Sequence, residues 1–133
     1  MKKLRHLKAY IVDDDEVELY VIQRIIYLKR LAEKVEVYRS GNELIEALQR
    51  TIEPPDYILI NYRMSGENGL EILEKIQDLN LNKPESPPFF ILTSSTADLS
   101  DLDAIMSDKN IDGFLYKPLI AKKLKEQLKS LFS

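Results

Sequence analysis

The chain has 133 residues, a length that fits one domain and is sufficient to enclose a full hydrophobic core. Its composition is that of an ordinary soluble globular protein, and a net charge of −3 gives no electrostatic reason to expect binding to nucleic acid or to an anionic membrane. The absence of cysteine excludes disulfides, thiolate metal sites and cysteine catalysis. The apolar run after the basic N-terminus is too short for a signal peptide or a membrane span. We therefore expect residues 1–133 to form a single cytoplasmic domain without an output domain.

Short apolar runs separated by turn residues predict five β-strands. Most of the runs are uninterrupted, which is typical of strands covered on both faces. In the second run valines alternate with polar residues, and this predicts a strand near an edge of the sheet with one side in water. The predicted strands are Lys8–Val12, the segment around Val35 and Val37, Tyr57–Ile60, Phe89–Leu92 and Gly113–Tyr116.

Apolar residues that recur every three or four positions predict an amphipathic helix after each strand. The pattern Ser40-Gly41-Asn42-Glu43 matches a capping box and predicts the start of the second helix. Three prolines between Asn80 and Pro88 predict a loop. The apolar residues that define the five helices are Val17, Tyr20, Val21, Ile25 and Leu28; Leu44, Ile45, Ala47 and Leu48; Leu70, Leu73, Ile76 and Leu79; Leu99, Leu102, Ile105 and Met106; and Ile120, Leu124, Leu128 and Leu131.

Strands that alternate with helices indicate an α/β fold of three layers, in which helices cover both faces of a parallel sheet. The carboxyl ends of parallel strands share one edge, where ligands and chemistry collect. We therefore expect Asp13 and Asp14, Asn61, Thr93 and Lys117 to meet there. Two adjacent carboxylates repel each other unless they bind a divalent ion such as Mg²⁺ or a lysine, and a hydroxyl with an ammonium suits a phosphoryl group.

The motifs IVDDDEV, PDYILINYRMSGENG, FFILTSS and GFLYKP, followed by a closing amphipathic helix, together resemble the receiver domain of bacterial two-component response regulators. The resemblance covers nearly the whole chain and implies a doubly wound, flavodoxin-like fold with strand order 2-1-3-4-5. It further implies that Asp13, Asp14 and the backbone carbonyl of Arg63 hold Mg²⁺. Thr93 falls on the switch hydroxyl, Phe114 on the aromatic switch position, and Lys117 on the family's lysine. The Lys117-Pro118 bond falls on one that is often cis.

Asn61 departs from the family, which places the phosphoacceptor Asp there. An amide oxygen is a poor nucleophile, so we expect no phosphorylation at Asn61. Loss of one carboxylate should also weaken Mg²⁺ binding, because one charge pair at about 4 Å is worth roughly 4 kcal/mol at an effective dielectric near 20. Ser65, where the family often has Pro, is expected only to loosen the loop. Two hypotheses for the cation at the acidic pair are Lys117 and the Arg63 guanidinium.

The leading functional prediction is a receiver-like protein of phosphorelay signal transduction that is not an enzyme. It would act by contact with a histidine kinase, a phosphotransfer protein or another signalling partner. By the resemblance, the surface built from the fourth helix, fifth strand and fifth helix serves as the docking face or as a homodimer contact. No nucleic-acid or membrane partner is expected.

Three alternatives stand beside this prediction. Asn61 would be a variant position in an ordinary phosphoaccepting receiver, or the chain would be a haloacid-dehalogenase-like phosphohydrolase, because Asp13-x-Asp15 follows an apolar strand. That family's acidic pair after the lysine is missing, since Glu126 is the only acid beyond Lys117. The plainest alternative is that the acidic residues form only a solvated helix start.

Overall fold

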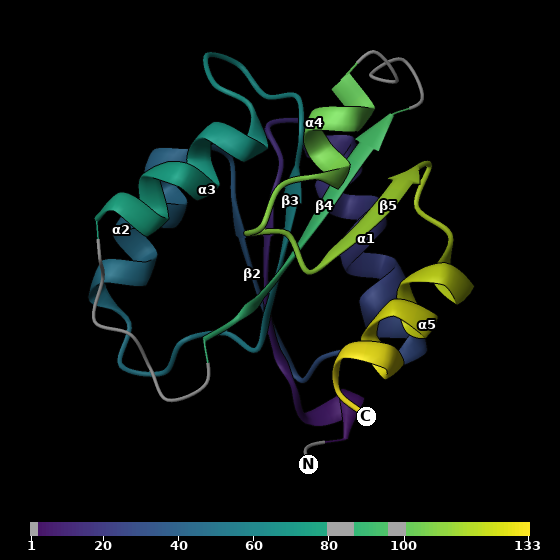
Figure 1. Ribbon diagram of the computed structural model, residues 1–133. Coiled ribbons are helices and arrows are strands. Elements are labelled where there is room, and N and C mark those ends of the chain that lie inside the picture. Colours follow the sequence, from purple (N-terminus) through teal and green to yellow (C-terminus); the bar gives the residue numbers. More distant parts are fainter. Residues whose placement is uncertain (1–2, 80–86, 96–100) are drawn as a thin grey trace.

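Parallel strands form the central sheet of the computed structural model, which describes residues 3–79, 87–95 and 101–133 (Figure 1). The sheet order in the described residues is β2-β1-β3-β4-β5, and every neighbouring pair is parallel, as predicted. The edge strand β2 is only partly covered, which confirms the interpretation of its alternating pattern. The strands are β1 (Lys8–Val12), β2 (Lys34–Tyr38), β3 (Tyr57–Asn61), β4 (Phe89–Ser95) and β5 (Gly113–Lys117).

The last three strands extend further than the sequence predicted. β3 includes Asn61, and the register aligns Asn61 with Thr93 of β4. β5 includes Lys117, which is aligned with Ser95. Because backbone pairing in the sheet holds these positions, their side chains leave a rigid scaffold rather than a free loop.

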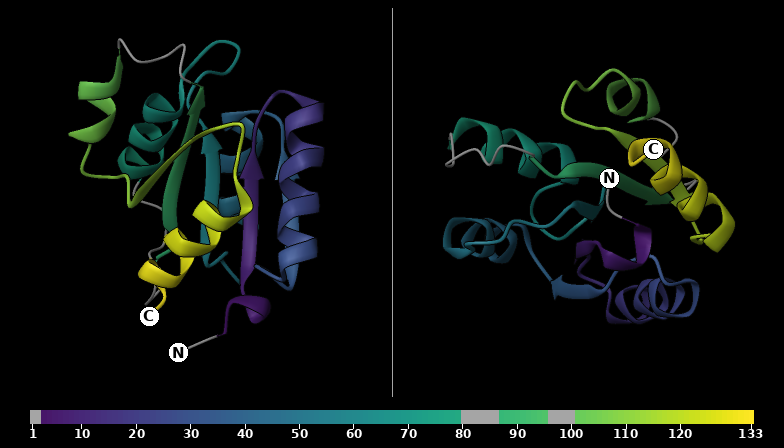
Figure 2. Two further views of the ribbon diagram at one scale, coloured as in Figure 1. Left: turned by 90° about the vertical axis from the view of Figure 1, so that its right-hand side faces the viewer. Right: turned by 90° about the horizontal axis from the view of Figure 1, so that it is seen from below.

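Helices cover both faces of the sheet (Figures 1 and 2). α1 (Glu16–Lys29) and α5 (Ala121–Leu131) pack on one face, where Ile22 of α1 and Leu128 of α5 belong to the same buried cluster. The other face is covered by α2 (Gly41–Arg50), α3 (Gly69–Asp78) and the short α4 (Leu102–Met106). A short 3₁₀ helix, η1 (Leu4–His6), precedes β1. Each fully buried Leu or Ile stabilises the fold by about 1.5–3 kcal/mol, so the two clusters fix the layers.

The apolar residues whose spacing predicted α1 are mostly not the ones that the helix buries. Leu19, Ile22 and Ile26 are the residues that the helix buries against the sheet. Most of the residues that define the predicted repeat are exposed: Val17, Tyr20, Val21 and Leu28, while Ile25 is half-buried. The spacing of these residues is correct for a helix, but α1 is apolar on two opposite faces, so the spacing alone did not select the face that packs.

Smaller differences occur at other helices. Of the residues that defined the last two predicted helices, Ile120 and Met106 are exposed, whereas Leu124, Leu128 and Ile105 are buried. Leu99 and most of the predicted loop, 80–86, lie outside the described residues. Within the described part of the chain, no helix is long and apolar enough to cross a membrane.

Side-chain caps explain where the helices begin. The Ser40 hydroxyl accepts a hydrogen bond from the Glu43 N–H, as the predicted capping box requires, but the Glu43 carboxylate accepts from the Arg39 N–H instead of completing the box. A complete capping box, which the sequence analysis missed, starts α3 and joins Asn68 to Glu71.

A buried tyrosine anchors the start of β3. The Tyr57 hydroxyl donates a 2.9 Å hydrogen bond to the carbonyl oxygen of Leu31, which follows α1. Burial, assisted by the neighbouring Asp56 carboxylate, raises the pKa of Tyr57 well above its ordinary value. The hydroxyl therefore stays protonated and keeps the end of α1 tied to the sheet.

Candidate functional site at the carboxyl edge of the sheet

Side chains from three strand ends meet at one edge of the sheet, as the topology predicted. Asp13 directly follows β1, while Asn61 and Lys117 are the last residues of β3 and β5. The Lys117 Nζ lies 2.6 Å from Asp13 Oδ2, and Asn61 Nδ2 lies 3.5 Å from Asp13 Oδ1. Asp13 is 1% exposed and the Lys117 side chain 12%, so this ion pair is shielded from solvent. Lys117 is therefore the cation that neutralises Asp13.

The Asn61 amide spans the site between two acceptors. Its Nδ2 donates a 2.6 Å hydrogen bond to the backbone carbonyl of Arg63, in addition to its longer contact with Asp13. Only the amide nitrogen suits this position, because an amide oxygen placed there would face two other oxygens. The Arg63 carbonyl, which the resemblance predicted as a metal ligand, thus already accepts a hydrogen bond from Asn61.

The loop after β3 is tied to the acidic pair through Ser65. The Asp14 carboxylate accepts two hydrogen bonds from this residue, one from its backbone N–H at 2.8 Å and one from its hydroxyl at 2.9 Å. A proline at position 65 could make neither bond. The expectation that Ser65 only loosens the loop is therefore wrong, since Ser65 fastens the loop to Asp14.

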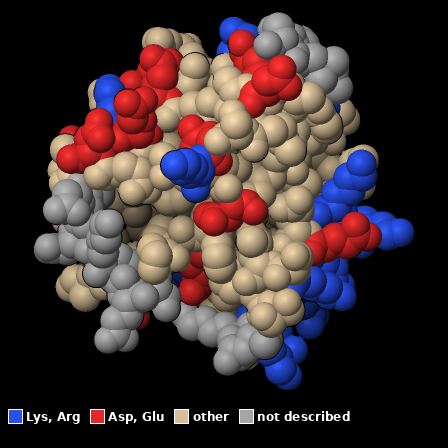
Figure 3. Space-filling view, in the orientation of Figure 1, with Lys and Arg blue, Asp and Glu red and all other residues tan. Residues whose placement is uncertain are grey.

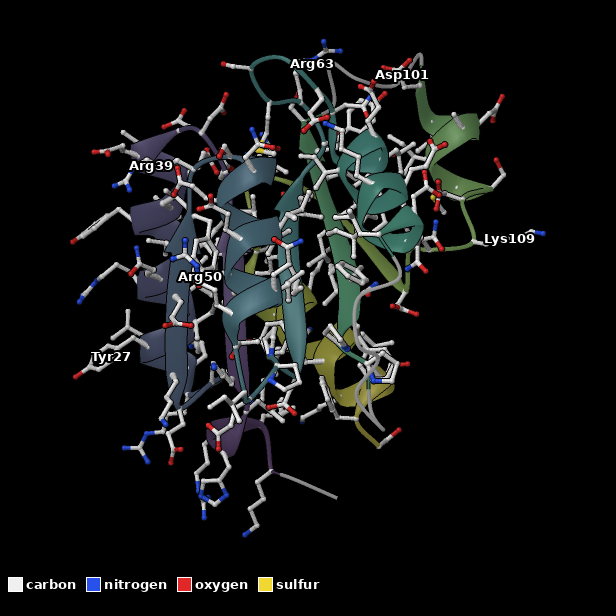
Figure 4. The ribbon with its side chains drawn as sticks, turned by 90° about the vertical axis from the view of Figure 1, so that its left-hand side faces the viewer. Tyr27, Arg39, Arg50, Arg63, Asp101 and Lys109 are labelled. Atoms are coloured by element: carbon white, nitrogen blue, oxygen red, sulfur yellow. The ribbon has the colours of Figure 1, made fainter. Side chains whose placement is uncertain are left out.

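Arg63 does not carry the role that one hypothesis gave its guanidinium. Arg63 forms an ion pair with Asp101, just before α4, at 3.8 Å. Figure 4 shows the two labelled side chains beside each other at the upper end of the molecule. The cation at Asp13 is Lys117, and the Arg63 side chain instead joins the loop after β3 to the start of α4.

The two predicted switch residues lie close to the site in the sheet. Thr93 is buried beside Asn61, and its backbone carbonyl accepts a 2.7 Å hydrogen bond from the Tyr62 N–H. Phe114 of β5 is half-buried and makes an edge-on contact with the Tyr116 ring, with 4.9 Å between centroids. The Lys117-Pro118 bond is cis, as the resemblance implied.

Two acidic residues near the site have structural roles that the sequence did not predict. Asp15 is the N-cap of α1, where its carboxylate accepts hydrogen bonds from the N–H groups of Val17 and Glu18. Glu18 lies one turn into α1, and its carboxylate is 3.8 Å from the Lys117 ammonium. The sequence feature that could have indicated this contact is the position of Glu18, four residues after Asp14 and in the first turn of a helix that starts at the site.

The donor set does not fit a divalent ion as it stands. Both Asp13 oxygens, one Asp14 oxygen and the Arg63 carbonyl accept hydrogen bonds from protein groups. Mg²⁺ usually binds through one or two carboxylates and keeps several waters, so it would have to displace these bonds. In residues 3–79, 87–95 and 101–133, no group of three or more His, Cys, Asp or Glu side chains is placed to hold a metal ion.

Residues 9–129 match the response regulator receiver domain family. The chain belongs to this family. Among curated relatives, it is 34% identical over 110 residues to the DNA-binding transcriptional regulator NtrC of Klebsiella pneumoniae, which covers 83% of this chain and 21% of that protein. It is 26% identical over 129 residues to the sensory/regulatory protein RpfC of Xanthomonas campestris, covering 97% of this chain and 17% of that protein.

The receiver fold is also found in solved structures. A response regulator receiver protein from Dyadobacter fermentans superposes with a TM-score of 0.79 at 28% identity, covering 96% of this chain and 98% of that one. The chain spans about a fifth of the length of the curated relatives it matches. Membership of the receiver family contradicts the haloacid-dehalogenase alternative.

Proposed function

We propose that this chain is a receiver that signals through protein contact and is not phosphorylated at position 61. Its family places it in two-component signalling. The observation that carries the proposal is the Asn61 amide, whose nitrogen is hydrogen-bonded to the Arg63 carbonyl and lies next to Asp13. The residue that should attack a phosphoryl group is a neutral amide that helps to hold the site together.

The chemistry of the site supports this proposal. A carboxylate at position 61 would offer an anionic oxygen to phosphorus, whereas the amide lone pair is delocalised and the product would not be a stable acyl phosphate. Asn61 is also 8% exposed, so little of it is open to a donor. The chain itself is not expected to be an enzyme, because Asp13, Asn61 and Lys117 hydrogen-bond to one another and to the backbone of the site.

Weak Mg²⁺ binding is part of the same proposal. Asp13 already has a cation at 2.6 Å in Lys117, and Ser65 holds Asp14 with two hydrogen bonds. Asp13, Asp14 and the Arg63 carbonyl would be the protein ligands of a bound ion, which would supply positive charge to phosphate oxygens. A metal at this edge would have to replace bonds that the protein already makes.

The surface of α4, β5 and α5 is the proposed docking face for a signalling partner. Each of its three elements carries an exposed apolar residue or flank: Met106, Tyr116 and Ile120. A groove of about 590 Å³ runs between β5 and α5. Figure 3 shows basic side chains gathered on the right, where α5 lies, and the exposed lysines of α5 are Lys122, Lys123, Lys125 and Lys129. These features favour a partner with an apolar segment flanked by acidic residues.

Phosphorylation with acetyl phosphate and Mg²⁺ tests the proposal. Intact-mass measurement should detect no added phosphoryl group on the native chain. An Asn61→Asp variant should gain one, because Asp13, Thr93 and Lys117 remain in place to support it. A phosphoryl group on the native chain at position 61 would overturn the proposal.

The same experiment addresses the alternative of an ordinary receiver that carries a variant Asn61. That alternative predicts that Asn61→Asp restores phosphorylation and also changes partner binding when phosphate is added. In our proposal the partner recognises the native Asn61 chain without acetyl phosphate. Pull-down with a cognate histidine kinase or phosphotransfer protein, with and without acetyl phosphate, separates the two.

A further inference from the structure

The outer edge of β5 is a strand edge with free backbone groups. β5 is the last strand of the sheet, and β4 is its only strand partner among the described residues. The Thr93 carbonyl accepts from the Tyr62 N–H, so the backbone groups of Thr93 point to β3. Thr93 is aligned with Leu115, and of two opposed residues in a parallel pair only one turns its backbone groups to the other strand. Leu115 therefore bonds to β4, and the N–H and carbonyl groups of its neighbours Phe114 and Tyr116 point outward.

A groove of about 590 Å³ follows this edge. It is lined by Phe114 and Tyr116 together with one side of α5, which includes Ile120, Lys123 and Gln127. Phe114 packs with the cluster on the α4 side of the sheet, whereas α5 packs on the opposite side, so a groove that touches both passes the edge itself. Figures 1 and 2 show β5 as the outermost strand, with α4 and α5 on its two faces. No bond to the outward groups comes from residues 3–79, 87–95 or 101–133.

The two edges of the sheet differ in their protection against strand pairing. Natural edge strands usually carry charged side chains that discourage the addition of another strand. The opposite edge, β2, has this protection in the exposed Lys34 and Glu36. β5 has aromatic rings instead, Phe114 and Tyr116, and its one charged residue, Lys117, is held in the ion pair of the site. The β5 edge is therefore the one that is open to another strand.

We propose that the β5 edge binds an extended segment of a signalling partner, which joins the sheet as a sixth strand. This inference rests on the docking face proposed above and specifies how that face is used. In strand addition, main-chain hydrogen bonds give affinity and alternate side chains give specificity. Side chains of the segment that lie beside Phe114 and Tyr116 share their face of the sheet, so apolar residues are expected there to pack against the two rings.

Charge indicates the side chains expected on the α5 side of the added strand. Lys123 lines the groove, is exposed and forms no ion pair with another described residue. The acids in the lining are Glu126 and Asp112, and the Asp112 carboxylate accepts from the Phe90 N–H. α5 carries four exposed lysines against one glutamate: Lys122, Lys123, Lys125 and Lys129. Acidic residues on the segment complement this helix, whereas pairing the β5 edges of two copies would bring two lysine-rich helices together.

The probe for this proposal is a peptide that alternates valine with glutamate. The sequence Ser-Val-Glu-Val-Glu-Val-Ser, acetylated and amidated at its ends, presents apolar side chains on one face and acidic ones on the other in either strand direction. The matched control is the same peptide with its valine and glutamate nitrogens methylated, since it keeps the side chains but cannot donate main-chain hydrogen bonds. The contact is small, so the peptide is titrated to millimolar concentration.

Amide hydrogen exchange measured by NMR tests the added strand directly. In the free protein the Leu115 N–H should be protected, while the outward N–H groups of Phe114 and Tyr116 exchange fast. Saturating peptide should slow the exchange of both outward amides by about tenfold or more. Val37 on β2 is the internal control: the Tyr38 carbonyl accepts from the Asp13 N–H, so the Val37 N–H points outward, and its exchange should not change. Equal protection of Val37 would mean unspecific pairing and would overturn the proposal.

Charge reversal on α5 tests the predicted acidic side chains. Lys123→Glu should weaken peptide binding by about fivefold, because one exposed charge pair is lost and a repulsion replaces it. Lys129→Glu is the matched control, since Lys129 is exposed on the same helix but does not line the groove, and it should change the affinity by less than about twofold. Equal weakening in both variants would overturn the assignment of the acidic residues to the groove.

The strand and the docking face can fail separately. A peptide that shifts the NMR signals of Met106 and Ile120 without slowing the two outward amides would leave the docking face in place and overturn strand addition. Absence of binding at millimolar peptide, or equal binding of the methylated control, would overturn it as well. Because the titration uses no phosphoryl donor, these results are independent of the acetyl phosphate test at Asn61.

Discussion

Asp13 is the charged residue that is buried most completely in residues 3–79, 87–95 and 101–133. It is almost completely buried, and its two oxygens accept from Lys117, from the Asp15 N–H and, at longer range, from Asn61. A buried carboxylate with a close cation is not itself a large source of stability, but removal of the cation leaves an uncompensated charge that costs about 3–5 kcal/mol. The main contribution of the Lys117 ammonium is therefore that it compensates the buried charge of Asp13.

A double-mutant cycle tests this dependence. Lys117→Met should lower the free energy of unfolding by about 3 kcal/mol at neutral pH, because the buried Asp13 carboxylate loses its cation. In an Asp13→Asn background the same substitution should cost much less. Urea denaturation of the four proteins measures the coupling.

Lys123→Met is the matched control, because Lys123 is exposed on α5 and its loss should change stability by no more than about 0.5 kcal/mol. An equal cost of Lys117→Met with and without the Asp13 carboxylate would contradict the cycle.

At the scale of secondary-structure elements, the first turn of α3 lies directly against the site. Gly69 begins this helix, and a Cβ there would lie 2.9 Å from the Asn61 carbonyl oxygen and 2.7 Å from Leu92 Cδ1. The Gly69 N–H also donates to the Tyr62 carbonyl at 2.6 Å. The close approach of α3 to β3 therefore depends on the absence of a side chain at this position.

Gly69→Ala should destabilise the fold by about 1–3 kcal/mol, because the added methyl meets backbone that cannot move freely. It should also shift the NMR signals of the Asn61 side-chain amide. Gly66→Ala is the comparison, since Gly66 has φ +92° with open space around it and should cost about 1 kcal/mol through backbone conformation alone. An Asn61 amide signal that moves equally in both variants would contradict this distinction.

The sequence predicted the elements better than it predicted their orientation. Parallel strands with their carboxyl ends at one edge follow from the alternation of short apolar runs and helical patterns, so the meeting of Asp13, Asn61 and Lys117 could be predicted. The packed face of α1 could not, because its buried residues recur with the same helical spacing as the exposed Val17, Tyr20, Val21 and Leu28. When both faces are apolar, only the tertiary contact decides which one is buried.

The hydrogen-bond partners within the site could not be predicted from the sequence either. The bonds from Ser65 to Asp14 depend on the path of the loop after β3, and the pairing of Arg63 with Asp101 depends on how far a long side chain reaches. Residue types at fixed spacing indicate which groups come near one another. They do not determine the rotamers that choose among several nearby acceptors.

At the scale of the whole molecule, the site connects strands that span most of the chain. Asp13 and Lys117 are 104 residues apart, and Asn61 lies on the central strand between them in the sheet. A change of charge at this site should therefore change the free energy of unfolding of the entire fold. Magnesium should reveal this through mass action, because a ligand that binds only the folded state raises its stability.

Asn61→Asp in the presence of a chelator should unfold at a lower temperature than the native chain, because a new carboxylate would lie about 3.5 Å from Asp13. One like-charge contact at about 4 Å costs roughly 4 kcal/mol at an effective dielectric near 20. Each kcal/mol should lower Tm by about 4 °C for a chain of this length. Millimolar Mg²⁺ should restore most of the loss in Asn61→Asp and leave the native Tm unchanged. Asn42→Asp adds the same charge at an exposed position on α2 and should show neither effect. If Mg²⁺ raised the Tm of the native chain as much as that of Asn61→Asp, the hydrogen bonds of Asn61, Ser65 and Lys117 would not exclude the ion.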